Sequence, residues 1–292
     1  MQKTFPIEIN EICEELGETY PKSIEQVHGG DIHSAWRIEF SNKKLFLKRN
    51  IRNKKFLEFE KYCLQNLRKY INQENLVIPE VIAYKNIKNI EILLIEWIDM
   101  HNFDQKKLGK GLGELHLNAN ESNPKIYGYP VEGFIGITNQ KKGWENNWVD
   151  CFIKLRITPQ LSLLKSNILD KKTIKKVESK IKSEFINHKP TNTLVHGDLW
   201  SGNIGIEKSG KGVIFDPASW WADNEVDIAM TKLFGGFRKE FYEEYYKIFP
   251  KKNGFEGRMI IYNFYHILNH ANMFGGSYIS QVKDYVNAII NM

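Results

Sequence analysis

The segment from Leu194 to Asn203 constrains the fold and chemistry of this chain more than any other. It reads Leu-Val-His-Gly-Asp-Leu-Trp-Ser-Gly-Asn, a strand end followed by a polar loop that presents Asp198 and Asn203. A second apolar segment, 213–215, ends in Asp216. The motif thus consists of a carboxylate, a carboxamide five residues later and a second carboxylate at the end of the next strand. Side chains at this spacing can hold a magnesium-nucleotide and a substrate hydroxyl.

Taken alone, this motif has two explanations. Asp and Asn are common in polar turns, where their side chains cap backbone groups. The alternative is a catalytic loop, which requires that the preceding chain supply a nucleotide-binding region. The rest of the sequence therefore decides between a turn and a site.

The composition is that of a globular protein, with 42% hydrophobic and 26% charged residues among 292 positions. This length allows one large core or two modest lobes. The net charge of +6 comes from lysine pairs spread along the chain rather than from one basic block. Because nucleic-acid-binding proteins concentrate their positive charge in a patch or an arm, we expect no nucleic acid partner.

The cysteines and the N-terminus indicate the compartment. Cys13, Cys63 and Cys151 are odd in number and widely spaced, which fits a reducing cytosol and gives no disulfide framework. The first residues lack the apolar core of a signal peptide, and no stretch has the ~20 apolar residues of a membrane span. We expect a cytoplasmic protein with no membrane partner. The sequence does not specify the oligomeric state, and a monomer is favoured.

The N-terminal part has the pattern of a short helix followed by antiparallel strands. Apolar spacing predicts a helix over 7–16, and alternation predicts strands at 24–27, 35–40 and 45–48. The first connection between these strands contains Gly29 and Gly30. Paired glycines are common in hairpin turns, and they also allow a loop to cover bound phosphates, so the local sequence fits both.

Lys48 and Glu60 form a second candidate pair. Lys48 shares its strand face with Phe46, so its ammonium points toward apolar surroundings. A predicted helix over 54–69 has an apolar stripe that includes Glu60. A carboxylate there is unfavourable unless a cation pairs with it, and kinase-like enzymes use such a pair to hold the α- and β-phosphates. The alternative is a slightly rotated helix with Glu60 in solvent.

Two further predicted strands, 80–84 and 90–95, precede a short linker of Glu96, Trp97 and Ile98. A buried strand that leads into such a linker suits a hinge whose backbone N–H and C=O groups bind adenine. We therefore predict an N-terminal nucleotide-binding lobe at 1–98, with the hinge at about 96–100. The C-terminal catalytic and substrate-binding lobe would span 99–292.

The pattern beyond the hinge is largely helical. Before the central motif, the sequence predicts a helix from Asp104, a loop rich in Gly, Pro and aromatic residues over 124–136, and helices near 144–166 and 170–187. After it, helices are predicted near 225–234, 237–249, 257–273 and 277–291.

Two side-chain pairs in this region are ambiguous. His266 and His270 have the i, i+4 spacing of a zinc-binding helix, but no third ligand is nearby, so a packed or exposed pair is favoured. Trp220 and Trp221 either stack on a sugar or fill the core, and the sequence does not decide between these roles.

The parts follow one another in kinase order: a β-rich lobe with a lysine–glutamate pair, a hinge, and a helical lobe that carries the central motif. In this arrangement the chain resembles the fructosamine (ketosamine) kinases, within the protein-kinase-like superfamily that includes aminoglycoside phosphotransferases. The resemblance covers most of the chain, and Trp200 in the catalytic loop separates this family from the aminoglycoside enzymes. Its most specific stretches are 196–203, 216–218, 233–237, 268–270 and 274–276.

The resemblance implies an α+β, bilobal protein-kinase-like fold and ATP-dependent phosphorylation of a ketosamine, the adduct of a reducing sugar and an amine. Family members act at the third carbon of the sugar, which destabilises the adduct and permits deglycation. By match to the motif, Asp198 would orient the hydroxyl and accept its proton, and Asn203 and Asp216 would hold Mg²⁺. Lys48, fixed by Glu60, would hold the α- and β-phosphates.

The implied cofactors are ATP and Mg²⁺, and the implied partner is a small-molecule or protein-bound ketosamine. Gly29 and Gly30 would lie over the phosphates, and the backbone of Glu96, Trp97 and Ile98 would bind adenine. The candidate substrate residues are Trp200, Trp220, Trp221 and Glu225.

Two departures from the family pattern concern regulation and substrate choice. Asp31 stands where some family members have a cysteine, so a disulfide-linked dimer through that loop is not expected. Asp223 replaces the usual histidine in the segment that ends in Glu225, which leaves the preferred sugar open.

Two other functions compete with the ketosamine kinase. One is a small-molecule kinase of the aminoglycoside or choline type. The other is a non-catalytic nucleotide-binding scaffold, which would have lost at least one of Lys48, Asp198, Asn203 and Asp216. All four are present.

Overall fold

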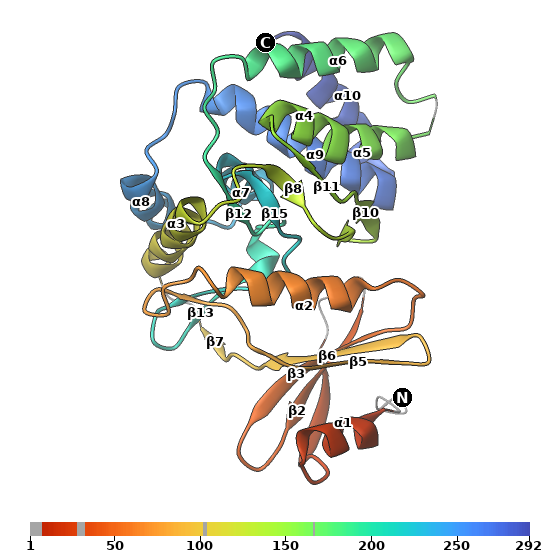
Figure 1. Cartoon of the computed structure of the whole chain (residues 1–292), viewed down its shortest axis with the longest axis vertical. Helices are drawn as coiled ribbons and strands as arrows, with labels where there is room; N and C mark the ends of the chain where they lie inside the picture. The colour runs from red at the N-terminus through yellow and green to blue at the C-terminus, as the bar shows by residue number, and fades with distance from the viewer. Residues whose placement is uncertain (1–7, 28–32, 102–103, 166) are drawn as a thin grey trace.

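The computed structural model describes residues 8–27, 33–101, 104–165 and 167–292. It has an N-terminal antiparallel sheet and a mainly helical C-terminal region (Figure 1). The predicted α+β, kinase-like fold class is confirmed. The predicted phosphate-covering glycines, Gly29 and Gly30, lie outside the described residues.

The N-terminal sheet has five strands in the order β1-β2-β3-β6-β5, and each pair is antiparallel. Lys48 in the middle strand pairs with Ala35 on one side and Leu93 on the other. The predicted strands are present within a few residues of their expected bounds, because alternation over such lengths is a strong local signal. The strands are β1 (Ser23–Val27), β2 (Ser34–Glu39), β3 (Lys44–Asn50), β5 (Val81–Ile87) and β6 (Ile90–Glu96).

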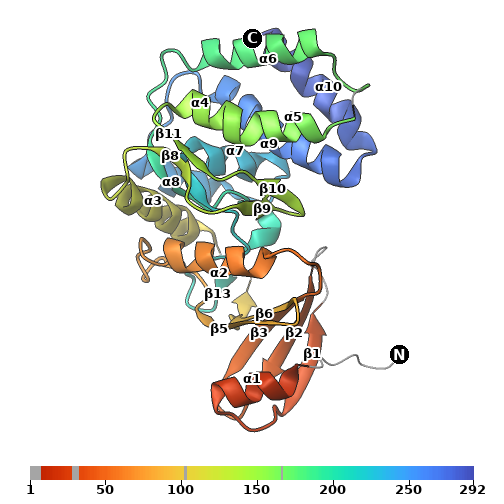
Figure 2. The ribbon, with the colours of Figure 1, turned by 45° about the vertical axis from the view of Figure 1, so that its right-hand side comes forward.

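One helix covers each face of this sheet. α1 (Ile9–Leu16) packs on the outer face, where its Ile12 belongs to a small buried cluster with Trp36 and Leu47. α2 (Phe56–Leu67) lies on the inner face, between the sheet and the C-terminal region (Figures 1 and 2). The predicted apolar stripe of α2 is buried. This helix therefore joins the sheet to the rest of the molecule.

The two regions share a sheet near the hinge. β4 (Leu76–Val77) pairs with β14 (Gly212–Ile214), and β7 (Met100–His101) pairs with β13 (Ile204–Glu207). Segments on both sides of the hinge thus enter one four-stranded sheet. The larger buried cluster likewise contains residues from α2 and from the C-terminal helices. A division at residue 98 stays a prediction, since packing is continuous across it.

The C-terminal region is built around α9 (Phe255–Phe274). Residues on all sides of this helix are buried, which is typical of a helix in the centre of a core. The other helices are α3 (Lys106–Glu121), α4 (Trp148–Phe152), α5 (Thr158–Leu163), α6 (Lys171–Glu184), α7 (Glu225–Leu233), α8 (Lys239–Ile248) and α10 (Ser277–Ile290).

The segment 124–145 differs from the prediction of a loop followed by a helix from 144. It forms four short strands: β8 (Tyr127–Tyr129), β9 (Gly133–Ile135), β10 (Thr138–Gln140) and β11 (Gly143–Glu145). Strands of three residues are too short to show alternation, and their partners can lie far along the chain. β8 pairs with β15 (Trp220–Asp223), which pairs with β12 (Asn192–Val195). The helix begins only at Trp148 and continues through a π-helical segment, Ile153–Ile157.

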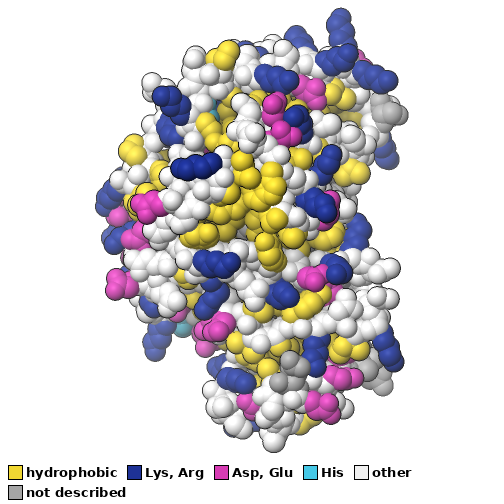
Figure 3. Space-filling model, in the orientation of Figure 1, with side chains coloured by type: hydrophobic (Ala, Val, Ile, Leu, Met, Phe, Trp, Pro, Cys, Tyr) yellow, Lys and Arg dark blue, Asp and Glu magenta, His cyan; other side chains and the backbone are white. Residues whose placement is uncertain are grey.

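Two surface properties bear on possible partners. Figure 3 shows Lys and Arg side chains scattered over one face of the molecule without forming a single patch. Among the helices of the described ranges, none combines the length and apolar character needed to cross a bilayer.

Candidate active site

The central motif lies in the loop that leads from β12 through a short 3-10 turn into β13. Within it, Nδ2 of Asn203 donates a hydrogen bond to the carbonyl oxygen of Asp198 at 2.9 Å. Asp216 follows β14, which pairs with β13. The adjacent Phe215 donates its N–H to the Asn203 carbonyl at 3.1 Å. The structure thus brings together the three side chains that the spacing singled out.

Lys48 connects the sheet to this loop. It is 6% exposed, and its Nζ lies 2.8 Å from Oε1 of Glu60 on α2. Nζ also forms an ion pair with Oδ1 of Asp216. Glu60 is 8% exposed, so the alternative with Glu60 in solvent is wrong. A buried carboxylate needs a cation because burial removes its hydration.

The charges of this triad are strongly interdependent. Burial alone disfavours the ammonium, but the carboxylates of Asp216 and Glu60 outweigh it and raise the pKa of Lys48. Burial raises the pKa of Glu60 to about 7, against the attraction of Lys48. Burial also works against ionised Asp216, yet Lys48 holds the pKa of that carboxyl below its usual range. Lys48 therefore stays charged and can neutralise negative groups in the site.

Asp198 has the properties of a general base. Burial raises the pKa of its carboxyl to about 7, and the nearby carboxylates of Asp216 and Asp227 act in the same direction. A group that titrates near the working pH combines proton affinity with a useful ionised fraction.

Asn203 and Asp216 fit a hard divalent cation, since amide and carboxylate oxygens are the ligands that Mg²⁺ accepts. The Asp198 carbonyl fixes Nδ2 of Asn203, which leaves its Oδ1 free to face an ion. The Asp216 side chain is 42% exposed, so it is accessible to an ion. Its backbone has a φ of 57°, a conformation that costs a non-glycine residue on the order of 1 kcal/mol and often marks functional positions.

The loop 196–203 is held by Asp227, a residue that was not among the predicted site residues. Asp227 on α7 is fully buried, and its two carboxylate oxygens accept the N–H groups of His196 and Gly197 at 2.7 and 2.8 Å. His116 lies 3.2 Å from the same carboxylate. Burial alone would raise the pKa of Asp227, but these donors hold it below its usual range. The available signal was a lone aspartate in an otherwise apolar helical stretch, 226–230.

The hinge offers fewer backbone groups than its three residues suggest. The N–H of Trp97 donates to the Lys44 carbonyl at 3.3 Å, so it is not available to a base. In the described part of the chain, no hydrogen bond occupies the N–H of Ile98. The Trp97 ring lies 5.9 Å from the ring of Phe46 on β3. Phe46, which precedes Lys48 by two positions on the same strand face, thus lies beside the predicted hinge.

Trp200 begins an aromatic surface beside the catalytic loop. Its side chain is 39% exposed and contacts Phe234, which is 41% exposed, with ring centroids 6.3 Å apart. Phe234 contacts His270, and His270 contacts Phe274 and Tyr278. We call these five residues the Trp200 cluster. Of these five residues, only Trp200 was predicted at the site, because the others come from segments far along the chain.

The two other candidate tryptophans lie on opposite faces of β15, as successive strand residues must. Trp220 is fully buried and stacks on Trp148 with ring centroids 5.4 Å apart. It fills the core, so a sugar-stacking role for Trp220 is wrong. Trp221 is half-buried against Tyr70, and no described ring contact joins it to the Trp200 cluster.

Glu225 begins α7 and is 5% exposed. Its carboxylate accepts two hydrogen bonds from Arg258 on α9, at 2.7 and 2.8 Å. Asp223, at the position of the family histidine, accepts hydrogen bonds from Tyr262 and His188. The partners of both carboxylates thus lie outside the catalytic loop. This placement favours a structural role, and a substrate contact for Glu225 stays a prediction.

His266 and His270 do not assemble a metal site within the described residues. Nδ1 of His270 donates to the carbonyl oxygen of His266 at 2.8 Å, and the favoured explanation of a packed helical pair agrees with this contact. Among the described residues, one group of three side chains that could bind a metal has its ligand atoms close together: His188, Asp223 and Glu225. Protein donors already bind its two carboxylates.

Comparison with known proteins supports the same assignment as the site. The fructosamine kinase family profile matches residues 6–292. A "probable ketoamine kinase" of Vibrio vulnificus is 35% identical over 289 residues, which cover 96% of this chain and 98% of the relative. A chloroplastic protein-ribulosamine 3-kinase of Arabidopsis thaliana is 35% identical over 205 residues, 68% of this chain and 62% of the relative.

Solved structures share the fold. The crystal structure of a "putative fructosamine-3-kinase" from Haemophilus somnus superposes with a TM-score of 0.84 at 26% identity and covers 96% of both chains. A mutant aminoglycoside phosphotransferase superposes with a TM-score of 0.62 at 13% identity, over 97% of this chain and 98% of that one, which shows a common fold alone. Because the family match extends over almost the whole chain and its fold agrees, this protein belongs to the fructosamine kinase family.

Proposed function

We propose that this protein transfers the γ-phosphoryl group of ATP to the 3-hydroxyl of a ketosamine. The observation that carries the proposal is the Asp198 carboxyl, with its pKa raised to about 7, in a loop that also presents Asn203 and faces Asp216 and Lys48. The names of the relatives, a ketoamine kinase and a ribulosamine 3-kinase, support the choice of acceptor.

The nucleotide would bind between the sheet and the catalytic loop. Lys48, held by Glu60, would contact the α- and β-phosphates, and Gly29 and Gly30 would cover them. The carbonyl of Glu96 and the N–H of Ile98 would bind adenine, since the N–H groups of Glu96 and Trp97 already donate to the carbonyls of Glu80 and Lys44. A structure with this fold, an aminoglycoside phosphotransferase, is a ternary complex with ADP and hygromycin B.

Asn203 and Asp216 would hold Mg²⁺, which neutralises charge on the transferred phosphate when bound. Lys48 pairs with Asp216. This contact keeps Asp216 ionised and ready to receive a cation.

Asp198 would orient the sugar hydroxyl and accept its proton as the oxygen attacks the γ-phosphorus. The bond between that phosphorus and the bridging oxygen breaks, and ADP leaves. Most of the acceleration in such a transfer comes from positioning and charge neutralisation, because the transition state is loose and needs little covalent help. The buried Asp227 would contribute by fixing the loop backbone on both sides of His196, through the N–H groups of His196 and Gly197.

The acceptor is proposed to be a ribulosamine, erythrulosamine or fructosamine adduct, free or on a protein. Phosphorylation at the third carbon destabilises the adduct and would place this protein in deglycation. Trp200 is the candidate that is exposed and lies two residues after Asp198 in the chain, so we assign it to acceptor binding.

We predict that Trp200→Ala raises the KM for the acceptor about tenfold while the KM for ATP stays the same. The loss corresponds to about 1.4 kcal/mol, within the range of an aromatic contact with its buried area. Initial rates at saturating ATP would measure it. Trp144→Ala is the matched control, because Trp144 is also 39% exposed and lies on β11. If Trp200→Ala and the unmodified protein have equal KM values for the acceptor, Trp200 does not contribute to acceptor binding.

One assay tests the proposed function. ADP release is expected with at least one of ribulosamine, erythrulosamine and fructosamine. The release should depend on Mg²⁺ and stop when the metal is chelated. Choline and aminoglycosides are run in parallel, since another small-molecule kinase would turn over one of these and no ketosamine. If none of the acceptors in the panel causes release of ADP, the result would favour the non-catalytic scaffold over both kinases.

A further inference from the structure

Arg156 is a buried cation that is not paired with any carboxylate of the described residues. It is 1% exposed, and no carboxylate of the described residues lies within ion-pair distance of its guanidinium. Its Nη1 donates to the carbonyls of Lys141 and Leu155 at 3.1 and 2.9 Å, and its Nε has no hydrogen-bond partner. Burial lowers the pKa of Arg156. Such a charge is costly to bury, so its presence calls for an explanation beyond stability.

The main contact of Arg156 is the Trp220 ring. The guanidinium carbon lies 4.1 Å from the ring centroid, close enough for a strong cation–π interaction in a dry environment. Trp148 stacks on the same indole at an interplanar angle of 22°. Arg156 belongs to the π-helical segment Ile153–Ile157, a distortion that is often found at functional sites. The indole is thus held by a guanidinium and a second aromatic ring.

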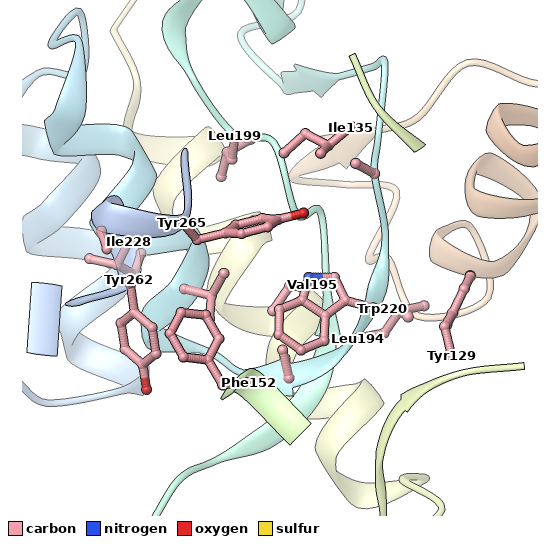
Figure 4. Close-up of a cluster of buried hydrophobic side chains, with 14 of the residues drawn as sticks. Tyr129, Ile135, Phe152, Leu194, Val195, Leu199, Trp220, Ile228, Tyr262 and Tyr265 are labelled. Atoms are coloured by element: carbon pink, nitrogen blue, oxygen red, sulfur yellow. The ribbon is translucent and has the colours of Figure 1, made fainter. Parts of the chain in front are cut away.

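Trp220 in turn supports the catalytic loop. It pairs with Val195, the last residue of β12 before the loop. Gly197 has a φ of +84°, and a Cβ there would lie 2.2 Å from the Ala218 carbonyl oxygen and 3.4 Å from Cδ1 of Trp220. Figure 4 shows Trp220 beside Leu194 and Val195, in the core beneath the motif. The loop backbone therefore rests on Trp220.

We propose that Arg156 is a positioning residue for phosphoryl transfer, which acts through Trp220 on the backbone of Gly197 and Asp198. The two carboxylate oxygens of Asp227 bind the loop amides, and Arg156 fixes the indole on which the loop rests. Displacement of a reacting group by about 1 Å can lower a rate on the order of 10²-fold. A planar guanidinium suits this task, because it stacks on an indole while its edge binds carbonyls.

The test uses Arg156→Met, which keeps an unbranched side chain and removes the charge and the donors. Lys154→Met is the matched control: Lys154 lies in the same π-helical segment but is exposed and pairs with Glu145. Hydrogen–deuterium exchange of the peptide 194–203 is expected to be about tenfold faster in Arg156→Met and unchanged in Lys154→Met. The melting temperature should stay the same or rise, since apolar replacement of a buried charge is often stabilising.

The kinetic part of the test rests on the proposed function. Arg156→Met is expected to lower kcat about 10- to 100-fold with an unchanged KM for ATP. The effects of Arg156→Met and Trp220→Phe on kcat should be non-additive in the double variant, because the two side chains act through one contact. Unchanged exchange in the 194–203 peptide, or faster exchange spread over all peptides, would overturn the proposal. If no ketosamine is phosphorylated, the exchange result still decides the role of Arg156, so the two failures are distinguishable.

Discussion

Asp198→Asn is expected to lower kcat by about 10²–10⁴-fold, the usual effect of removing a general base. The amide keeps the size of the side chain but cannot accept the proton of the attacking hydroxyl. Lys48, Glu60 and the hinge are untouched, so the affinity for ATP should change little. Initial rates of ADP release with the best acceptor would measure the first effect, and calorimetric titration with Mg·ATP the second.

The control for this substitution is Asp284→Asn, which removes an exposed carboxylate on α10. Its kcat should match that of the unmodified protein. Full activity in Asp198→Asn would refute the assignment of Asp198 and, with it, the proposed catalytic loop. A loss of ATP binding without a change in kcat would instead assign Asp198 to the nucleotide.

Arg258→Met is expected to destabilise the protein by about 3–5 kcal/mol, the range for removing one partner of a buried ion pair. Arg258 and Glu225 are 4% and 5% exposed, and two hydrogen bonds of 2.7 and 2.8 Å join them. Without the guanidinium, Glu225 would be buried beside Asp223, with His188 3.9 Å from its carboxylate. Denaturant unfolding would measure the change in the free energy of unfolding.

Lys180→Met, which breaks the partly exposed pair of Lys180 with Glu184, is the control for Arg258→Met and should have a much smaller effect on the free energy of unfolding.

The predicted substrate role of Glu225 can be tested separately. If Glu225 is structural, folded Glu225→Gln protein keeps the acceptor KM of the unmodified protein. An acceptor KM raised tenfold in Glu225→Gln, with stability retained, would return Glu225 to the substrate site.

The candidate site could be proposed from the sequence because its residues lie at short spacings within single elements or loops. Asp198 and Asn203 share one loop, and Lys48 and Glu60 lie in elements whose alternation and helical periodicity are clear. Periodicity fixes which face of a strand or helix a residue occupies. Periodicity placed Glu60 within the apolar stripe but left a solvent-exposed Glu60 as an alternative, and the Lys48–Glu60 distance of 2.8 Å decides for the inward direction.

Features that depend on pairs of distant residues were missed or misplaced. The strands β8–β11 are too short to have a pattern of their own, and β8 is ordered by its partner β15. The sequence around Asp227 does not show its role. Only the position of α7 in the fold shows that its carboxylate accepts hydrogen bonds from the amides of His196 and Gly197. Trp220 could not be separated from Trp221 as a core residue, since adjacent strand residues face opposite sides and only packing shows which side is buried.

The sequence by itself determined that this chain carries a kinase motif with Asp198, Asn203 and Asp216, and that Lys48 and Glu60 precede it on a strand and a helix. Local spacing proposed the motif, and the order of the parts together with the family resemblance decided between a polar turn and a catalytic loop. Only the tertiary structure decided what supports the motif: the carboxylate of Asp227 and the indole of Trp220 beneath Arg156. These contacts join residues that are far apart in the chain, and a single sequence has no local signal for which buried groups will meet.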